Sequence, residues 1–124
     1  MPHLVVHCSE SVTHLAAPGA ITDVVFEAAA STGLFASTGT GGIKVRLEPF
    51  RHYRNVDGGE HFVHVFGYIM AGRTAEQKAA LSARVVRALK RLLPSVEVIS
   101  MNVTDFERAS YRNATMVEAD DVAR

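Results

Sequence analysis

The sequence contains a single cysteine, Cys8, in 124 residues. No disulfide can therefore form within the chain, and a reducing compartment is the expected setting. No segment approaches the run of roughly 18 apolar residues that a membrane span needs. The opening residues also lack the basic start and the apolar stretch of a signal peptide. We therefore expect a soluble, cytoplasmic protein that has no membrane partner.

The chain also lacks an excess of charge of either sign. Its 13 lysines and arginines balance 13 aspartates and glutamates, which gives a formal net charge of zero. A neutral chain has no electrostatic basis for broad contact with nucleic acid or with an anionic membrane. We expect no nucleic-acid partner, and a small anionic ligand would have to be held by a local cluster of cations.

The first half of the chain has the pattern of a strand, a helix and a second strand. A β-branched apolar run over residues 4–8 predicts the first strand. Apolar side chains at helical spacing over residues 21–33 predict a helix of about a dozen residues that ends at a glycine. After a glycine-rich turn at 36–42, apolar and charged side chains alternate over residues 43–48, which predicts a half-buried strand.

The second half repeats this order. The long apolar run at 62–71 predicts a strand that is covered on both faces for most of its length. Thr74 and Gln77 have the spacing of a capping box, so a helix should begin there. Pro94 ends that helix, and the apolar residues at 96–99 predict the start of a fourth strand.

These patterns predict one domain over residues 1–124 of the α/β (α+β) class. Two βαβ repeats, at about 1–56 and 57–104, precede a polar C-terminal tail at 105–124 that we expect to cover a partner. Right-handed βαβ units place their two strands parallel, so the repeats should form a four-stranded sheet with both helices on one face. The other face would then be bare, and a chain of this size should bury it by self-association.

Pro2 is the residue with the clearest chemical meaning. Proline at the second position favours removal of Met1, which would leave a free secondary amine at the start of the chain. A model α-amino group has a pKa of about 7.7–8.0, and burial near cations would lower that value. The neutral amine would then serve as a general base near pH 7. Proline at this position is often not catalytic, but here a strand follows at once and would hold the amine rigidly.

Three cations could hold an anionic substrate. Lys44 and Arg46 point from the same face of one predicted strand, where the alternative is an ordinary solvated surface. Arg73 lies at the junction between a strand and a helix, and the helix N-terminus itself favours anions. Such donors bind carboxylates and stabilise negative charge as it develops on an enolate.

The histidines do not predict a metal site. His3 and His7 share a strand face but are roughly 13 Å apart along it, and His61 and His64 point to opposite faces. We interpret all six histidines as structural or surface residues. Cys8 has the pattern of a small buried apolar residue, and the glycines at 39–42 lack the lysine of a phosphate-binding loop.

Four segments resemble the tautomerase superfamily, and its 5-carboxymethyl-2-hydroxymuconate Δ-isomerase branch in particular. They are the opening MPHLVVHCSE, the segment ASTGLF, the strand GIKVRL and the junction AGRTAEQK, which match in order and spacing over most of residues 1–103. GRTAEQK and the helix after it also resemble the single βαβ unit of 4-oxalocrotonate tautomerase.

The resemblance implies a homotrimer whose sheets enclose a central barrel, with pockets at the subunit boundaries. It assigns the catalytic base to Pro2 and substrate binding to Arg73, together with Lys44 or Arg46 of a neighbouring subunit. Lys44 falls where the family usually has an arginine, which keeps the charge but loses the bidentate fork. The position equivalent to Pro2 in the second repeat is near Val63, so one site per chain is expected.

The implied activity is that of a cofactor-independent isomerase without a metal. Its substrate would be an unsaturated 2-hydroxy or 2-oxo acid with two or three carboxylates, from bacterial catabolism of hydroxyphenylacetate-type aromatics. Two alternatives remain open. One is another reaction of the superfamily, dehalogenation or decarboxylation. The other is a non-catalytic trimeric binding protein, which would follow if Met1 were retained.

Overall fold

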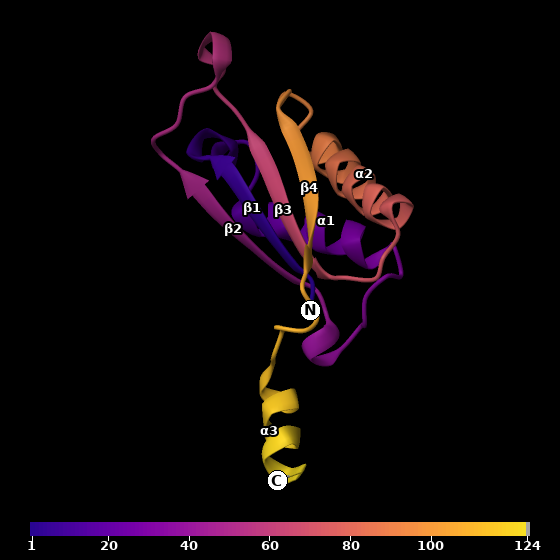
Figure 1. The fold of residues 1–124 in the computed structure, drawn as a ribbon. Coiled ribbons are helices and arrows are strands. Elements are labelled where there is room, and N and C mark those ends of the chain that lie inside the picture. The colour runs from indigo at the N-terminus through magenta and orange to yellow at the C-terminus, as the bar shows by residue number, and fades with distance from the viewer. Residues whose placement is uncertain (124) are drawn as a thin grey trace.

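The computed structural model describes residues 1–123, which form a four-stranded sheet with helices on one side (Figure 1). The strands are β1 (His3–Ser9), β2 (Lys44–Phe50), β3 (Val63–Met70) and β4 (Ile99–Phe106). The α-helices are α1 (Pro18–Ala30), α2 (Ala75–Leu92) and α3 (Ala114–Ala123), and short 3-10 turns lie at Glu10–His14, Gly39–Gly41 and Val56–Gly58.

The sheet has the order β2-β1-β3-β4 and joins two βαβ units. β1 is parallel to β2, β3 is parallel to β4, and the two units meet where β1 runs antiparallel to β3. The predicted repeat and the predicted parallel pairs are therefore confirmed. β1 is an inner strand with a hydrogen-bonded neighbour on each side, so the start of the chain is fixed from both sides.

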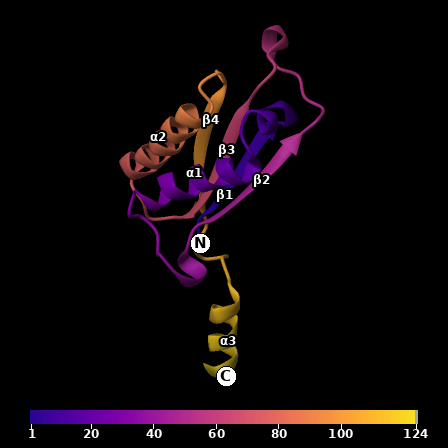
Figure 2. The ribbon, with the colours of Figure 1, turned by 180° about the vertical axis from the view of Figure 1, so that it is seen from behind.

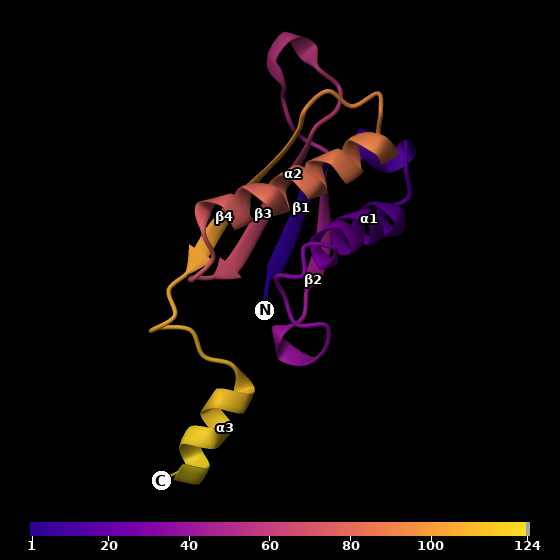
Figure 3. The same ribbon diagram turned by 90° about the vertical axis from the view of Figure 1, so that its right-hand side faces the viewer.

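Both long helices cover the same face of the sheet, as predicted. Views from opposite sides and from the edge show α1 and α2 together on that face (Figures 2 and 3). Each inner strand and each helix contributes alternate or helically spaced side chains to one core. Its fully buried members on these elements are Leu4, Val6, Cys8, Ile21, Val25, Ala29, Val63, Val65, Ile69, Leu81, Val85 and Leu89.

The capping box before α2 is present as predicted. The Thr74 hydroxyl accepts from the backbone N–H of Gln77 at 3.1 Å, and the Gln77 side-chain oxygen accepts from the Thr74 N–H at 2.9 Å. These two bonds satisfy donors that a helix N-terminus otherwise leaves open. They fix where α2 begins, and hence the position of Arg73 immediately before it.

The first helix and the start of the fourth strand differ most from the predictions, by three residues. The first helix was expected over 21–33, but α1 begins at Pro18, because the fixed φ of proline suits the first helical position. The fourth strand was expected from residue 96, but β4 begins at Ile99. Val96 is buried beneath the preceding turn and Val98 is 52% exposed, so these apolar residues do not belong to the strand.

The face of the sheet opposite the helices is open within the described chain. β3 was predicted to be covered on both faces, but its buried and half-buried residues alternate strictly. The half-buried set includes His64, Phe66 and Tyr68, whose rings follow one another along this face. The prediction was wrong for a single chain, because the apolar run has cover on the helix side only.

The C-terminal tail leaves the sheet and ends in α3, which projects away from the rest of the molecule (Figures 1 and 3). β4 reaches Phe106, so the strand includes the first residues of the predicted tail. Met116 and Val117 of α3 are 38% and 46% exposed. None of the described helices is long and apolar enough to cross a membrane.

Candidate active site

The start of the chain lies at one end of the sheet, where the fold holds Pro2 in place. Pro2 is buried directly before β1, and its carbonyl oxygen accepts a hydrogen bond from the Lys44 N–H at 3.0 Å. This bond extends the parallel pairing of β1 and β2 by one residue. The position of Pro2 is therefore set by the sheet.

The amine at the chain start lies beside Lys44. The Met1 amine donates to the carbonyl oxygens of Thr40 at 2.6 Å and Gly42 at 3.0 Å. The Lys44 ammonium donates to the same two carbonyls, at 3.1 and 2.6 Å. Burial, followed by the charges of Lys44 and Arg73, lowers the pKa of this amine to about 6. While Met1 is present, the Pro2 nitrogen is an amide and has no basic lone pair.

Arg73 comes to the same place from the turn between β3 and α2. Gly72 makes that turn with φ of 127°, a conformation that favours glycine. One Arg73 nitrogen donates to the Leu34 carbonyl at 2.7 Å, and the guanidinium lies 5.4 Å from the centre of the Phe35 ring. These contacts leave the guanidinium with further donors for a ligand.

A pocket of about 280 Å³ lies at this end of the sheet. Two guanidinium groups and no carboxylate are among the side chains that line it. The lining residues are Met1, Pro2, Phe35, Ala36, Thr40, Gly41, Met70, Arg73, Arg108, Tyr111 and Asn113. An adjacent pocket of about 400 Å³ shares Phe35 and Ala36 with it and is lined by Lys44. Together they form a cationic hollow around the chain start, suited to a polyanionic ligand.

Arg46 lies next to this hollow, on the open face of the sheet. Its guanidinium is 3.0 Å from Nδ1 of His3, and neither pocket at the chain start includes it in its lining. Burial lowers the pKa of His3, and the charges of Arg46, Lys44 and the chain terminus add to that effect. A neutral His3 accepts a hydrogen bond from Arg46, so His3 holds that side chain towards the chain start.

The structure thus brings Pro2, Lys44 and Arg73 together within one chain. Arg46 lies beside them on the open face of the sheet, outside the lining of both pockets. The resemblance implies that Lys44 or Arg46 of a neighbouring subunit joins Arg73, and this stays a prediction; within one chain, parallel pairing places Lys44 beside its own terminus. The sequence analysis missed Arg108, Tyr111 and Asn113, which line the pocket because the tail passes the chain start after β4. No local pattern in the tail indicates that path.

Neither His64 nor Cys8 is placed as a reactive group. No group of three or more metal-ligating side chains occurs in the described part of the chain. The His64 ring is engaged at both nitrogens, at 2.6 Å from Ser100 Oγ and 2.6 Å from Asn102 Oδ1. Burial raises the pKa of the Cys8 thiol to about 11, so the reactive thiolate is scarce at neutral pH.

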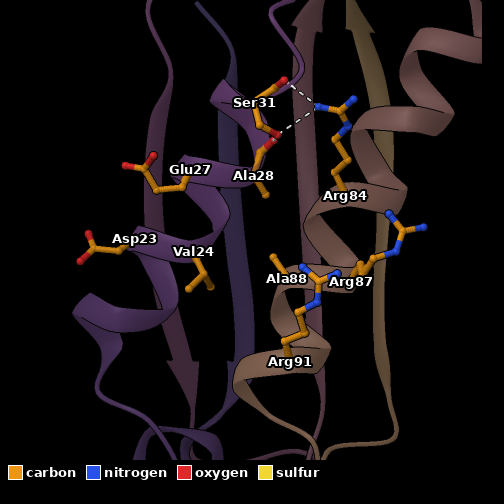
Figure 4. A pocket seen from close by; sticks show the side chains of 9 residues that line it. All are labelled: Asp23, Val24, Glu27, Ala28, Ser31, Arg84, Arg87, Ala88 and Arg91. Carbon is orange, nitrogen blue, oxygen red and sulfur yellow. Dashed lines mark hydrogen bonds between the residues drawn. The ribbon is translucent and has the colours of Figure 1, made fainter.

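A larger groove of about 460 Å³ lies between α1 and α2, on the far side of the helix layer from the open face (Figure 4). Val24, Ala28 and Ala88 form its apolar floor, and Arg84 closes one end by donating to the Ser31 carbonyl at 2.6 Å. Asp23 and Glu27 also line it, but the groove lacks the amine with a lowered pKa that distinguishes the chain start. We therefore place the candidate site at the chain start.

The fold is shared with known isomerases. A 5-carboxymethyl-2-hydroxymuconate isomerase from Deinococcus radiodurans R1 superposes with a TM-score of 0.74 at 20% identity, over 97% of this chain and 93% of that one. A 5-carboxymethyl-2-hydroxymuconate delta-isomerase gives a TM-score of 0.68 at 19% identity, over 100% and 93%. A fused 4-OT protein described as a symmetric trimer gives a TM-score of 0.70 at 14% identity, over 92% and 94%.

No curated protein matches the chain in sequence. The family model for 5-carboxymethyl-2-hydroxymuconate isomerase matches residues 2–118, nearly the whole chain, and begins at the proline. The match spans both βαβ units, the pocket at the chain start and part of the tail. The chain therefore belongs to the 5-carboxymethyl-2-hydroxymuconate isomerase family and is an isomerase with the tautomerase fold.

Proposed function

We propose that the protein, once Met1 has been removed, isomerises 5-carboxymethyl-2-hydroxymuconate or a close relative, with the amine of Pro2 as the base. The observation that carries this proposal is the convergence of the chain start, Lys44 and Arg73 on one corner of the sheet. An amine in that corner has a lowered pKa. A carboxylate entering the same corner meets two cations.

The reaction is a proton transfer and needs no cofactor. The neutral Pro2 nitrogen takes the proton of the 2-hydroxyl group, which leaves a dienolate. The resulting ammonium returns the proton to another carbon of the conjugated chain, so the substrate ends as its 2-oxo isomer. Arg73 and Lys44 bind carboxylates and stabilise the negative charge of the dienolate. The same positive charges keep the Pro2 amine neutral between turnovers.

We further propose that the working form is a homotrimer in which the open sheet faces are enclosed. That face exposes a line of aromatic rings and imidazoles that includes His7, Phe66, Tyr68 and Phe106. Arg46 and His3 lie on the same face and would approach a neighbouring subunit there. Enclosing the face removes apolar surface from water, which is the usual driving force for such assembly.

The assembly is tested by light scattering. We expect the mass of three chains, from a 13.4 kDa subunit, at micromolar concentration. Substituting Phe66 with glutamate should dissociate the assembly, because it places a charge in the middle of the enclosed face. A matched Leu15→Glu substitution, at a side chain that is 46% exposed, should not. A wild-type protein that stays monomeric would remove the trimer from the proposal.

The activity is tested with 5-carboxymethyl-2-hydroxymuconate and protein whose intact mass shows that it begins at Pro2. We expect kcat/KM to rise with pH along one limb whose midpoint lies below about 8, the value of a model α-amino group. The sign follows from the chemistry, because protonation at low pH removes the base. Burial and the charges of Lys44 and Arg73 lower the pKa of the terminal amine to about 6, and the same surroundings should lower this midpoint.

A substrate panel separates this proposal from the other reactions of the superfamily. A haloacrylate and a 3-oxo acid probe dehalogenation and decarboxylation respectively. Turnover of either one, with no isomerisation of the muconate, would replace the proposed reaction while leaving Pro2 in its role. Absence of all three activities in protein that begins at Pro2 would favour the binding-protein alternative.

A further inference from the structure

Arg108 is a second guanidinium in the wall of the pocket that contains Pro2. It lies just beyond β4, in the first residues of the tail, and lines this pocket together with Tyr111 and Asn113. One of its nitrogens donates to the Ala71 carbonyl at 2.7 Å, on the same turn that positions Arg73. Two arginines thus flank one short turn, each held by a single backbone carbonyl.

Most of the hydrogen-bonding capacity of Arg108 is unused within the described residues. Among the described residues no carboxylate lies within ion-pair distance of it, and the pocket lining contains no acidic side chain. A guanidinium has five N–H donors, and only one nitrogen is used here by the backbone. Its other donors form the fork that matches a carboxylate.

The chemistry of the proposed substrate calls for a third cation. Muconate has a carboxylate at each end of its six-carbon chain, and the carboxymethyl group adds a third. Lys44 and Arg73 can neutralise two of them. Arg46 lies on the open sheet face beside His3, whereas Arg108 lines the pocket itself. Arg108 is therefore the cation placed to meet the third charge.

We propose that Arg108 binds the third carboxylate and thereby makes the enzyme prefer tricarboxylate over dicarboxylate muconates. The inference rests on the proposed function, since it assigns one more contact at the same site. Arg108 is a specificity-determining residue and takes no part in moving the proton. Because Arg108 belongs to the tail, the preference for tricarboxylates depends on a residue that follows β4.

The test compares two substrates that differ only in the carboxymethyl group. We expect Arg108→Ala to raise KM for 5-carboxymethyl-2-hydroxymuconate about tenfold or more, as loss of a charge-assisted hydrogen bond implies. KM for 2-hydroxymuconate should change by less than about twofold. Arg108→Lys, which keeps the charge but loses the fork, should restore part of the preference.

Arg112→Ala is the matched control, because this arginine belongs to the same tail but donates only to the Ala109 and Tyr111 carbonyls. It should leave both substrates unchanged. If Arg108→Ala weakens both substrates equally, the residue only orders the tail, and the inference is wrong. If it weakens neither, the inference is also wrong, and the proposed function stands. A wild-type protein that begins at Pro2 and turns over neither substrate would overturn both.

Discussion

Protein that retains Met1 is expected to lose isomerase activity by about 10²- to 10⁴-fold, the range that a positioned general base contributes. In that form the Pro2 nitrogen is an amide, and the nearest amine is the one that Met1 holds against the Thr40 and Gly42 carbonyls. That amine is basic but lies one residue away from the proposed position. The fold should not change, because Pro2 keeps its place before β1.

The comparison uses two preparations of one sequence, separated only by processing and checked by intact mass. Circular dichroism should be the same for both. Pro2→Ala is the milder variant, since it leaves a primary amine in nearly the same place, and it should retain part of the activity. Full activity in protein that carries Met1 throughout would contradict the role of Pro2 and most of the case for this mechanism.

Arg73→Ala should reduce kcat/KM for the muconate by about 10²-fold or more, the cost of removing one donor that stabilises an oxyanion. The guanidinium is also one of the charges that lower the pKa of the terminal amine. Its removal should therefore shift the pH midpoint upward, so that a higher pH is needed for the neutral base. Both effects come from one group, and one pH–rate profile measures them together.

Two further variants make this test specific. Lys44→Arg restores the fork that the family usually has at this position and should preserve or improve turnover. Arg87→Ala removes an arginine that lines the groove between α1 and α2, away from the site, and should have no effect. If Arg73→Ala leaves kcat/KM within about twofold, below 0.5 kcal/mol of transition-state stabilisation, the assigned role is wrong.

The sequence was sufficient to predict the sheet, because each strand and helix has its own hydrophobic period. Alternation at 43–48 and the 3.6-residue spacing of α2 indicate which side chains face the core before any contact is known. The boundaries were less predictable. Val96 and Val98 are as apolar as strand residues, but Val96 is buried in the turn after α2, and Val98 only accepts a hydrogen bond from the Val63 N–H before β4 begins at Ile99.

The residues around the candidate pocket were predictable only in part. The sequence singles out Pro2 and Arg73 by position, one at the chain start and one between a strand and a helix. No sequence pattern singles out Arg108, because it reaches the pocket only through the path of the tail after Phe106. That path depends on tertiary contacts, such as the hydrogen bond to the Ala71 carbonyl, which cannot be predicted from the spacing of residues in the tail.

The antiparallel junction of β1 and β3 has a consequence for the history of the chain. Two βαβ units of the same order, joined by an antiparallel pair of strands, are the arrangement that duplication and fusion of one βαβ segment would produce. In such a fusion the second copy has no terminal amine, because its first nitrogen becomes part of a peptide bond. The equivalent position near Val63 is now buried core. The second unit can therefore contribute to a site at the chain start only through side chains such as Arg73, while its strands and helix complete the sheet and the core.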